Sequence, residues 1–377
     1  MRDTVLTSEA VTAAHPDKLC DRISDAMVDA CLVAEPPSGC VAECAIASGV
    51  VFLSLRHGGA LAFDPVGLAR EVLEEAGPPD PTAAQTTVML DALESAALAP
   101  EAVRGQREAD RMTTAFGYAC DHTASRMPLP LVAAHRIARA IGEAAGTESA
   151  PWLSPDAQVQ VAVRFRDRRP VALTGVALTV FAGEGAPEAG SLEETVGTRI
   201  VAPALEGLEP GPDAGTRLSV HAIPGPGGRA AHSGLTGRKT SEDCYGGAAR
   251  HSGSALSGKD PSRIDRVAAY AARQAAVSLV AAGLVRECEV QLSYVSGERA
   301  PASLEVTAFG SAHEPESALS TLLREAVDFR VDALAERLGL WELPRLRGGG
   351  FYRALAAHGH FGRPELDLPW EAPLPLG

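Results

Sequence analysis

Apolar residues recur along this chain at two spacings, and each spacing predicts a type of element. Between residues 16 and 34 they return every three or four positions, at Leu19, Ile23, Met27 and Cys31, which is the period of a helix with one buried face. The same helical period is found in further ranges: 66–76, 128–145, 264–283, 315–326 and 329–339. Alternating or continuous apolar runs predict strands in other ranges: 41–55 with a break at Gly49, 157–165, 171–181, 287–295 and 303–309.

The order of these elements favours an α+β protein over a doubly wound fold. Strands and helices do not alternate regularly, and no Gly-x-Gly-x-x-Gly motif follows the first strand, so a dinucleotide-binding domain is not expected. Residues 206–228 are rich in proline and glycine, which predicts a connection rather than a helix or strand. We expect three domains of mixed α and β structure: an N-terminal domain over 1–105, a central domain over 106–228 and a C-terminal domain over 229–377.

Composition and charge exclude some classes of partner. The 377 residues carry a formal net charge of −14, whereas a protein that binds a nucleic-acid backbone needs a basic face, so no nucleic acid is expected as a partner. No window approaches the roughly 18 uninterrupted apolar residues of a membrane span, and the opening Met-Arg-Asp-Thr lacks the apolar core of a signal peptide. Cys20, Cys31 and Cys44 lie in apolar stretches and are expected to be buried free thiols. These features predict a cytoplasmic protein with no membrane partner.

Lysine is rare in this chain, and the few lysines share one kind of surroundings. Only three of the 34 basic residues are lysine, namely Lys18, Lys239 and Lys259, and the rest are arginine. A bias toward arginine replaces exposed lysines at little cost, because one solvated cation serves there as well as another. Each remaining lysine lies in a polar stretch that contains glycine or aspartate. Lysine ammonium groups beside carboxylates point to a polyphosphate bound together with Mg²⁺.

Short motifs along almost the whole chain carry a family resemblance. In chain order they are Thr7-Ser8-Glu9, His15-Pro16-Asp17-Lys18, Cys20-Asp21-Arg22-Ile23-Ser24-Asp25-Ala26, Phe116-Gly117-Tyr118-Ala119, Pro151-Trp152-Leu153, Pro155-Asp156-Ala157, Gly234-Leu235-Thr236-Gly237-Arg238-Lys239, Ser257-Gly258-Lys259-Asp260-Pro261, Ile264-Asp265-Arg266 and Gly359-His360-Phe361-Gly362-Arg363. Together they resemble methionine adenosyltransferase (S-adenosylmethionine synthetase), the family that joins methionine to ATP. The resemblance implies three similar α+β domains about a pseudo-threefold axis, the S-adenosylmethionine synthetase fold. It also implies a homodimer or homotetramer with active sites at the subunit interface.

The resemblance further implies a role for each matching residue. His15 resembles the residue at the ribose–triphosphate junction, where an imidazole can hydrogen-bond the departing oxygen, and Lys259 and Arg238 complete the implied catalytic set. The residues implied to contact ATP and its phosphates are Lys18, Asp156, Arg238, Lys239, Lys259 and Arg263, the last in place of a family lysine. The implied metal ligands are Asp17 and Asp265 for two Mg²⁺ ions per site, and Glu43 for K⁺.

The methionine end of the implied site departs from the family pattern. Arg56 stands where a glutamate would meet the methionine ammonium, and Ser95 stands near the place of a glutamine. Gln158 replaces a lysine. The family's Gly-Ala-Gly-Asp-Gln-Gly loop reads Glu108-Ala109-Asp110-Arg111-Met112-Thr113, so Asp110 matches its aspartate only with a shift of one residue.

A shortened loop adds to these departures. Before the Gly-Leu-Thr-Gly-Arg-Lys motif the chain reads Arg229-Ala230-Ala231-His232-Ser233, which removes an aromatic residue on the adenine side and an aspartate on the substrate side. Each charge-assisted bond that is lost weakens binding by roughly 1–3 kcal/mol. The changes gather on one half of the implied site.

Three functions are open on the sequence. The first, and our prediction, is synthesis of S-adenosylmethionine from ATP and methionine, with release of tripolyphosphate and its hydrolysis to phosphate and diphosphate. The second is a paralogue that keeps the ATP and triphosphate site but uses a different nucleophile or nucleotide; Arg56 would suit an anionic acceptor. The third is a non-catalytic, nucleotide-binding partner subunit, and the retention of His15, Asp17 and Asp265 argues against it.

Overall fold

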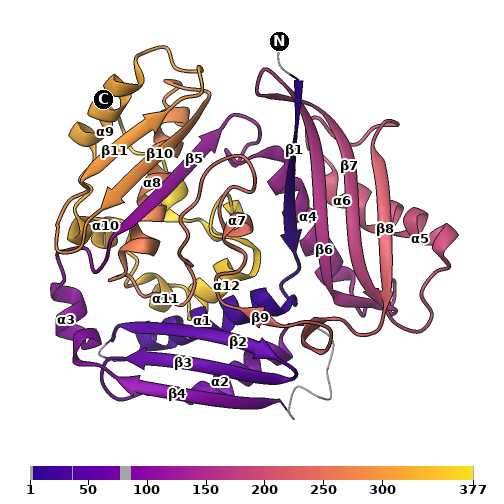
Figure 1. Ribbon diagram of the computed structural model, residues 1–377, viewed down its shortest axis with the longest axis horizontal. Coiled ribbons are helices and arrows are strands. Elements are labelled where there is room, and N and C mark those ends of the chain that lie inside the picture. Colours follow the sequence, from indigo (N-terminus) through magenta and orange to yellow (C-terminus); the bar gives the residue numbers. More distant parts are fainter. Residues whose placement is uncertain (1–2, 36, 77–85, 377) are drawn as a thin grey trace.

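The computed structural model describes residues 3–35, 37–76 and 86–376, and it places three sheets around a central group of helices (Figure 1). The strands are β1 (Asp3–Val11), β2 (Cys40–Ala47), β3 (Val50–His57), β4 (Thr87–Glu94), β5 (Thr113–Cys120), β6 (Leu153–Arg166), β7 (Arg169–Ala182), β8 (Arg217–Pro224), β9 (Gly234–Leu235), β10 (Glu287–Tyr294) and β11 (Ser303–Thr307). The longer helices are α1 (Pro16–Val33), α2 (Pro65–Glu74), α4 (Leu129–Ala144), α5 (Ala189–Val196), α8 (Ile264–Ala281), α9 (Glu316–Ala326) and α12 (Phe351–His358). The shorter helices are α3 (Pro100–Gly105), α6 (Ala202–Leu205), α7 (Thr240–Asp243), α10 (Val331–Arg337) and α11 (Leu343–Leu346).

The three sheets repeat one pattern. Their strand orders are β9-β2-β3-β4, β1-β6-β7-β8 and β5-β10-β11. Each sheet contains an antiparallel hairpin, and another strand pairs antiparallel with the first strand of that hairpin. In two of the sheets a further strand pairs in parallel with the second strand of the hairpin. A long helix, α1, α4 or α8, precedes each hairpin in the chain and packs on the sheet that contains it (Figure 1). This threefold repetition confirms the expected α+β fold of three similar units.

The units exchange their first strands in a cycle. β1 precedes α1 in the chain but pairs with β6, β5 precedes α4 but pairs with β10, and β9 precedes α8 but pairs with β2. Each sheet is therefore completed by a strand from another part of the chain. The domain division 1–105, 106–228 and 229–377 stays a prediction.

Helix α1 begins where the sequence predicts it, and it is buried over most of its surface. His15 caps it: Nδ1 of the ring accepts a hydrogen bond from the backbone N–H of Asp17 at 3.2 Å. Pro16 occupies the first turn, where a missing N–H costs no helical hydrogen bond. Leu19 and Ile23 lie in a core shared with β2, β5 and α8. All seven cysteines are buried and free, which confirms the expectation for the three in apolar stretches.

Most elements expected from the apolar pattern are confirmed. The expected helices correspond to α1, α2, α4, α8, α9 and α10, with ends that agree within two residues. The 41–55 run is the hairpin of β2 and β3, and it turns at Ser48 and Gly49, whose φ angles of 49° and 76° suit a tight two-residue turn. No helix in the part of the chain that the structure describes combines the length and apolar character needed to cross a membrane.

One expectation about the fold is wrong. The proline- and glycine-rich range 206–228 is not only a connection, because it contains β8, which pairs in parallel with β7. The exposed edge of β7 supplies hydrogen-bond partners for this backbone, and Leu218, Val220 and Ala222 pack against the core under that sheet. Tertiary pairing thus makes a strand of a segment whose composition disfavours one.

The contact of β5 with α8 leads to a first prediction. A Cβ atom added at Gly117 would lie 2.0 Å from the carbonyl carbon and oxygen of Ala272. Gly117→Ala is expected to destabilise the protein by about 3 kcal/mol, because backbone atoms cannot move aside as a flexible side chain does. Gly142→Ala in α4 is the matched control, since nothing lies within 4 Å of its added Cβ, and it should leave the melting temperature unchanged or raise it. Calorimetry on both variants checks this, and an unchanged melting temperature for Gly117→Ala would contradict it.

Candidate active site

A first group of polar residues lies at the N-terminal end of α1. We call it the His15 group, and its members are His15, Asp17, Asp156, His232, Arg238 and Lys239. Asp17 is buried, and one of its carboxylate oxygens accepts a hydrogen bond from the backbone N–H of Leu235 at 3.0 Å. The guanidinium of Arg238 and the ammonium of Lys239 each lie 3.5 Å from a carboxylate oxygen of Asp17. The pairing of β9 with β2 brings these two cations to α1.

His15 is uncharged at neutral pH. Burial is the main cause and lowers the pKa of its imidazole to about 4; Asp156 opposes this shift, and the nearby Lys239 reinforces it. Because Nδ1 accepts the hydrogen bond from Asp17, the neutral ring carries its proton on Nε2. His15 can therefore donate a hydrogen bond from Nε2 without first gaining a proton.

Asp156 and His232 lie beside the His15 ring. Oδ2 of Asp156 accepts a hydrogen bond from the backbone N–H of Gly228 at 2.6 Å and lies 2.7 Å from Nε2 of His232. Oδ1 of Asp156 is buried, and no hydrogen-bond partner for it lies in the described part of the chain. The His232 ring lies 5.0 Å from the His15 ring and 5.5 Å from the edge-on ring of Phe181, measured between centroids. This part of the site thus holds two imidazoles and a buried carboxylate. One oxygen of that carboxylate has hydrogen-bond partners, and the other has none among the described residues.

A second group surrounds the start of α8. We call it the Asp265 group, and its members are Asp110, Arg111, Lys259, Arg263 and Asp265. The Lys259 ammonium lies 2.6 Å from Oδ2 of Asp265, and Nη1 of Arg111 lies 3.5 Å from the same oxygen. Oδ1 of Asp265 is buried, and none of the residues in 3–35, 37–76 and 86–376 forms a hydrogen bond with it. A buried carboxylate flanked by two cations, with one free oxygen, is suited to bind a cation and an anion together.

Asp110 organises the cations of this group. It accepts hydrogen bonds from Arg263 and Arg111, both at 2.9 Å, and from the backbone N–H of Ile264 at 3.1 Å. Burial raises the pKa of its carboxyl group, but these three donors outweigh burial and lower the pKa below its usual value. Burial lowers the pKa of Lys259, although Asp265 partly offsets this. Asp110 is therefore ionised at neutral pH and holds Arg263 in place.

The two groups are separate within one chain. Among the residues that the structure describes, no hydrogen bond or ion pair joins a member of the His15 group to a member of the Asp265 group. Lys259 approaches β2 through a backbone bridge to Val41, and Glu43 lies exposed two residues further along the same strand. The potassium ligand expected from the sequence thus lies on the same strand as the bridge to Lys259.

Lys18 differs from the other two lysines. Its ammonium is only 2 % exposed and lies 3.0 Å from Oδ2 of Asp21 and 2.6 Å from Oδ1 of Asp243. Burial would lower the pKa of Lys18, but the two carboxylates outweigh it and raise the pKa. In this structure Lys18 therefore ties α7 to α1, which gives its retention as a compact ammonium a structural cause.

Of the residues that depart from the family pattern, Asp110 and Arg111 belong to the Asp265 group, whereas Arg56, Ser95 and Gln158 belong to neither group. Arg56 points outward from β3 and Gln158 outward from β6, and both are exposed. Ser95 is half-buried after β4, where its backbone N–H donates to the carbonyl of His57 at 2.8 Å. In the described part of the chain none of these three side chains has a hydrogen bond or ion pair to the His15 group or the Asp265 group.

Two residues of this region were not expected as site residues. His232 contacts Asp156, and Glu242 lies 3.8 Å from the Lys239 ammonium while accepting a hydrogen bond from the backbone N–H of Val11 at 2.8 Å. The only signal for His232 in the sequence is that it is the histidine of the shortened loop. Lys239 is the N-cap residue of α7, and Glu242 lies within that helix three residues further on.

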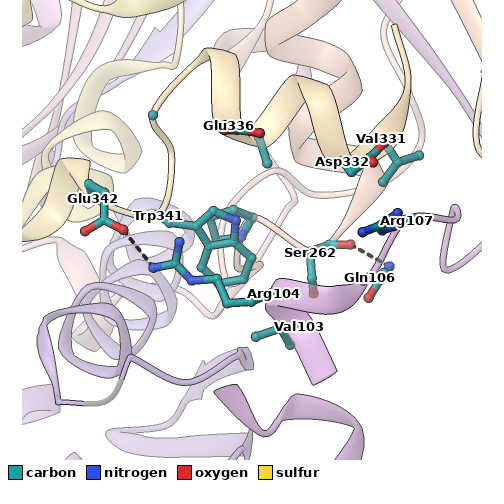
Figure 2. A pocket seen from close by; sticks show the side chains of 13 residues that line it. Val103, Arg104, Gln106, Arg107, Ser262, Val331, Asp332, Glu336, Trp341 and Glu342 are labelled. Atoms are coloured by element: carbon teal, nitrogen blue, oxygen red, sulfur yellow. Dashed lines mark hydrogen bonds and ion pairs between the residues drawn. The ribbon is translucent and has the colours of Figure 1, made fainter. Parts of the chain in front are cut away.

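A cavity of about 430 Å³ lies apart from both groups (Figure 2). In Figure 2 the guanidinium of Arg104 lies over the ring of Trp341, 4.8 Å from its centroid, and pairs with Glu342 at 2.8 Å. Gln106 closes the other side by donating to the carbonyl of Ser262 at 3.0 Å. None of the site residues expected from the sequence lines this cavity, although its lining residues Pro261 and Ser262 directly precede Arg263 in the chain.

Comparison with known proteins gives a consistent result over the whole chain. Three family models match in order: S-adenosylmethionine synthetase, N-terminal domain, over residues 3–95; its central domain over 106–221; and its C-terminal domain over 226–372.

Curated relatives agree with these matches. An S-adenosylmethionine synthase of Prochlorococcus marinus (strain MIT 9303) is 39% identical over 400 residues, covering 97% of this chain and 94% of the relative. An S-adenosylmethionine synthase of Synechococcus sp. (strain CC9902) is 39% identical over 397 residues, covering 97% of this chain and 96% of the relative. An S-adenosylmethionine synthase of Thermosynechococcus vestitus is 38% identical over 400 residues, covering 97% of this chain and 95% of the relative. The three family domains in order, on a fold of three exchanged units, place this chain in the S-adenosylmethionine synthetase family.

Proposed function

We propose that this protein is a methionine adenosyltransferase that makes S-adenosylmethionine from ATP and methionine and hydrolyses the released tripolyphosphate. In this reaction a lone pair of the methionine sulfur forms a bond to C5′ of ATP, and the bond from C5′ to the triphosphate oxygen breaks and leaves its electron pair on that oxygen. The observation that carries the proposal is the pair of cation and carboxylate groups, around Asp17 and around Asp265. A leaving group with about four negative charges needs such a dense set of cations.

His15 can assist the breaking of the bond between C5′ and the triphosphate oxygen. Its neutral ring carries a proton on Nε2, and a hydrogen bond from this proton would stabilise charge as it develops on the departing oxygen. Lys239 and Arg238 would hold the phosphate chain on the same side, and Lys259 and Arg263 would hold it from the Asp265 group. Lys18 would act indirectly, because its ammonium is enclosed by two carboxylates.

The residues present fit the Mg²⁺ ions that the family fold implies. Asp17 and Asp265 are buried, and Oδ1 of Asp265 lacks a hydrogen-bond partner among the described residues, so a hard cation would compensate it. Two Mg²⁺ ions, one at each carboxylate, would neutralise phosphate charge when bound. Glu43 would hold K⁺ from β2, and its exposed carboxylate leaves it free to do so.

One mass-spectrometric assay tests the proposal. The purified chain is incubated with ATP, methionine, Mg²⁺ and K⁺, and the products are examined for S-adenosylmethionine, phosphate and diphosphate. We expect all three, and none when EDTA removes Mg²⁺. ATP binding measured by calorimetry without formation of S-adenosylmethionine would overturn the proposal in favour of a paralogue with a different nucleophile.

Asp110 provides a second prediction, about methionine. Because Arg56 replaces the family glutamate, the methionine ammonium needs another carboxylate, and Asp110 is ionised and 10 % exposed. Asp110→Asn is expected to raise the methionine KM by roughly tenfold or more, which is the loss of one charge-assisted bond of about 1.5–3 kcal/mol. Steady-state kinetics with each substrate varied in turn check this. If the KM for ATP rises while that for methionine does not, Asp110 acts only by holding Arg263.

We further propose that the working unit is at least a homodimer, with sites that combine the two groups across subunits. The sheet β9-β2-β3-β4 has α1 and α2 on one face (Figure 1). Its other face carries the exposed Phe52, Met89 and Leu235, which the strand registers place side by side. A second copy on this face would bury these side chains. A monomer in light scattering, with activity retained, would contradict this.

The cytoplasmic location stays an expectation from the sequence.

Complementation between two inactive variants gives a third prediction. His15→Asn keeps an N-cap side chain for α1 but removes the imidazole, and Lys259→Ala removes the ammonium of the other group. If each site takes one group from each subunit, mixed dimers have one intact site, so an equal mixture reassembled from dissociated subunits should recover roughly a quarter of wild-type activity. Either variant reassembled alone is the control. No recovery, with mixed dimers shown to form, would mean that both groups act within one chain.

A further inference from the structure

Two imidazoles and a carboxylate lie together at the start of α1 in an arrangement that could hold a metal ion. His15, Asp156 and His232 each offer one ligand atom, and these atoms all lie within 4.8 Å of one another. We propose that these three residues form a binding site for a divalent transition metal ion of the zinc and cobalt type, distinct from the Mg²⁺ sites. This inference goes beyond the proposed function and does not depend on it.

Three different parts of the fold build this cluster. Asp156 lies on β6, which pairs with β1, and His15 follows β1 directly. His232 lies in the connection from β8 to β9, which the hydrogen bond from Gly228 to Asp156 fastens at 2.6 Å. The Phe181 ring supports the other side of His232. Because β1 and β9 are exchanged strands, the cyclic arrangement of the units brings the three ligands together.

Asp156 shows an unmet need for a cation. Its side chain is 1 % exposed, yet among the residues that the structure describes Oδ1 has no hydrogen-bond partner, and the other oxygen contacts Gly228 and His232. Burying an ionised oxygen without a partner is unfavourable, and a bound cation would compensate it. His232 is 29 % exposed on its side chain, which leaves an approach to the cluster from solvent.

The ligand types select the metal. Imidazole nitrogens favour Zn²⁺, Co²⁺, Ni²⁺ and Cu²⁺, whereas Mg²⁺ favours an octahedron of oxygens. A tetrahedral ion with bonds of about 2.0–2.1 Å holds its ligand atoms about 3.4 Å from one another. The more widely separated ligand atoms, now within 4.8 Å, would therefore move closer together, and the Asp156–His232 pair would open from 2.7 Å. Coordination through Nε2 of His15 would move the ring proton and end the 3.2 Å hydrogen bond from Asp17, which is a long and weak one. Three protein ligands leave a fourth position open for water.

A bound ion would have a chemical consequence for the site. The ion would bind the Nε2 lone pair of His15 and fix the orientation of its ring. It would also bind the carboxylate of Asp156. An ion of this class would therefore oppose the proposed reaction, whereas Mg²⁺ would support it. The cluster would act as a site at which a transition metal competes with the nucleotide.

Cobalt titration of the full chain, free of any affinity tag, stripped with EDTA and without nucleotide, tests the site. We expect visible absorption bands of low-coordinate Co²⁺ that saturate at one ion per chain and that excess Mg²⁺ does not remove. His232→Ala should weaken Co²⁺ binding by at least about 10–100-fold. His313→Ala, which removes an exposed histidine elsewhere, is the matched control and should bind as the wild type does.

A second variant separates loss of a ligand from disorder of the loop. His232→Gln can still donate a hydrogen bond to Asp156 but offers no nitrogen lone pair, so it should lose Co²⁺ binding while keeping the wild-type melting temperature. Absence of the bands, equal binding in His232→Ala, retained binding in His232→Gln, or displacement by Mg²⁺ at comparable concentration would each overturn the proposal. None of these readouts uses S-adenosylmethionine formation, so failure here leaves the proposed function untouched.

Discussion

Replacing Lys259 by alanine is expected to lower kcat/KM for S-adenosylmethionine formation by about 10²–10³-fold. Its side chain is 11 % exposed and its ammonium is held 2.6 Å from Asp265, so the ammonium is placed in advance and moves little when charge develops on the triphosphate. No other lysine lies in the Asp265 group, and Arg111 at 3.5 Å from Asp265 is too far to take its place without rearrangement. Steady-state kinetics with ATP and methionine varied separately measure the loss.

The matched control for this prediction is Arg330→Ala. Arg330 also forms an ion pair with an aspartate, Asp328, but the pair is exposed and far along the chain from either group. The Arg330→Ala variant should keep the wild-type kcat/KM and melting temperature, because an exposed ion pair contributes about 0–1 kcal/mol to stability. Circular dichroism should show both variants folded. Activity of Lys259→Ala near the wild-type level would mean that the role assigned to Lys259 is wrong.

The largest expected effect on stability comes from Arg266. Its guanidinium is fully buried and pairs with the fully buried carboxylate of Asp25, which joins α8 to α1. Nε donates to the carbonyl of Leu256 at 2.7 Å, and the guanidinium lies 4.3 Å from the ring centroid of Tyr352. Arg266→Met is expected to destabilise the protein by about 3–5 kcal/mol, because it leaves the charge of Asp25 buried without its partner.

A double variant tests this cause. In Arg266→Met with Asp25→Leu no charge is left unpaired, so a large part of the lost stability should return. If the double variant is as unstable as the sum of the two single variants, the pairing of charges is not the cause. Calorimetry at one fixed protein concentration compares them, since an oligomer melts at a temperature that depends on concentration.

The pH dependence of Arg266→Met follows from Asp25. Burial raises the pKa of Asp25 to about 6 although Arg266 acts against this, so removal of Arg266 raises the pKa further. A folded-state pKa above the unfolded value means that the folded protein binds the extra proton, and stability is regained as the pH falls through the folded pKa. The deficit of Arg266→Met relative to the wild type should therefore shrink between pH 8 and pH 5. A deficit that does not change over this range would contradict the assignment.

The candidate site was predictable where chemistry lies in contiguous motifs. The runs around Asp17, Lys239 and Lys259 each contribute a cation or carboxylate to one of the two groups. Lys18 lies in the same kind of run, but its ammonium faces inward to Asp21 and Asp243. A polar neighbourhood in the sequence cannot distinguish an open site from a closed ion-pair network, because the difference depends on which side of α1 the residue faces.

His232 marks the limit of reasoning from the sequence in the opposite direction. Nothing in its short loop indicates a partner, since Asp156 is 76 residues away and His15 lies near the start of the chain. The contact exists because β1 and β9 cross into sheets built by other parts of the chain. Long-range pairing of this kind leaves no periodic signal.

The sequence by itself determined the helices, the hairpins and the family. Helices and hairpins depend on hydrogen bonds and apolar contacts within a few residues, so α1, α4, α8 and the hairpin of β2 and β3 follow from local spacing. The tertiary structure alone decided the exchange of β1, β5 and β9, the strand β8 in a proline- and glycine-rich segment, and the meeting of His15, Asp156 and His232. These features depend on backbone and side-chain partners far apart in the chain, whose pairing is favourable only once all three sheets are assembled.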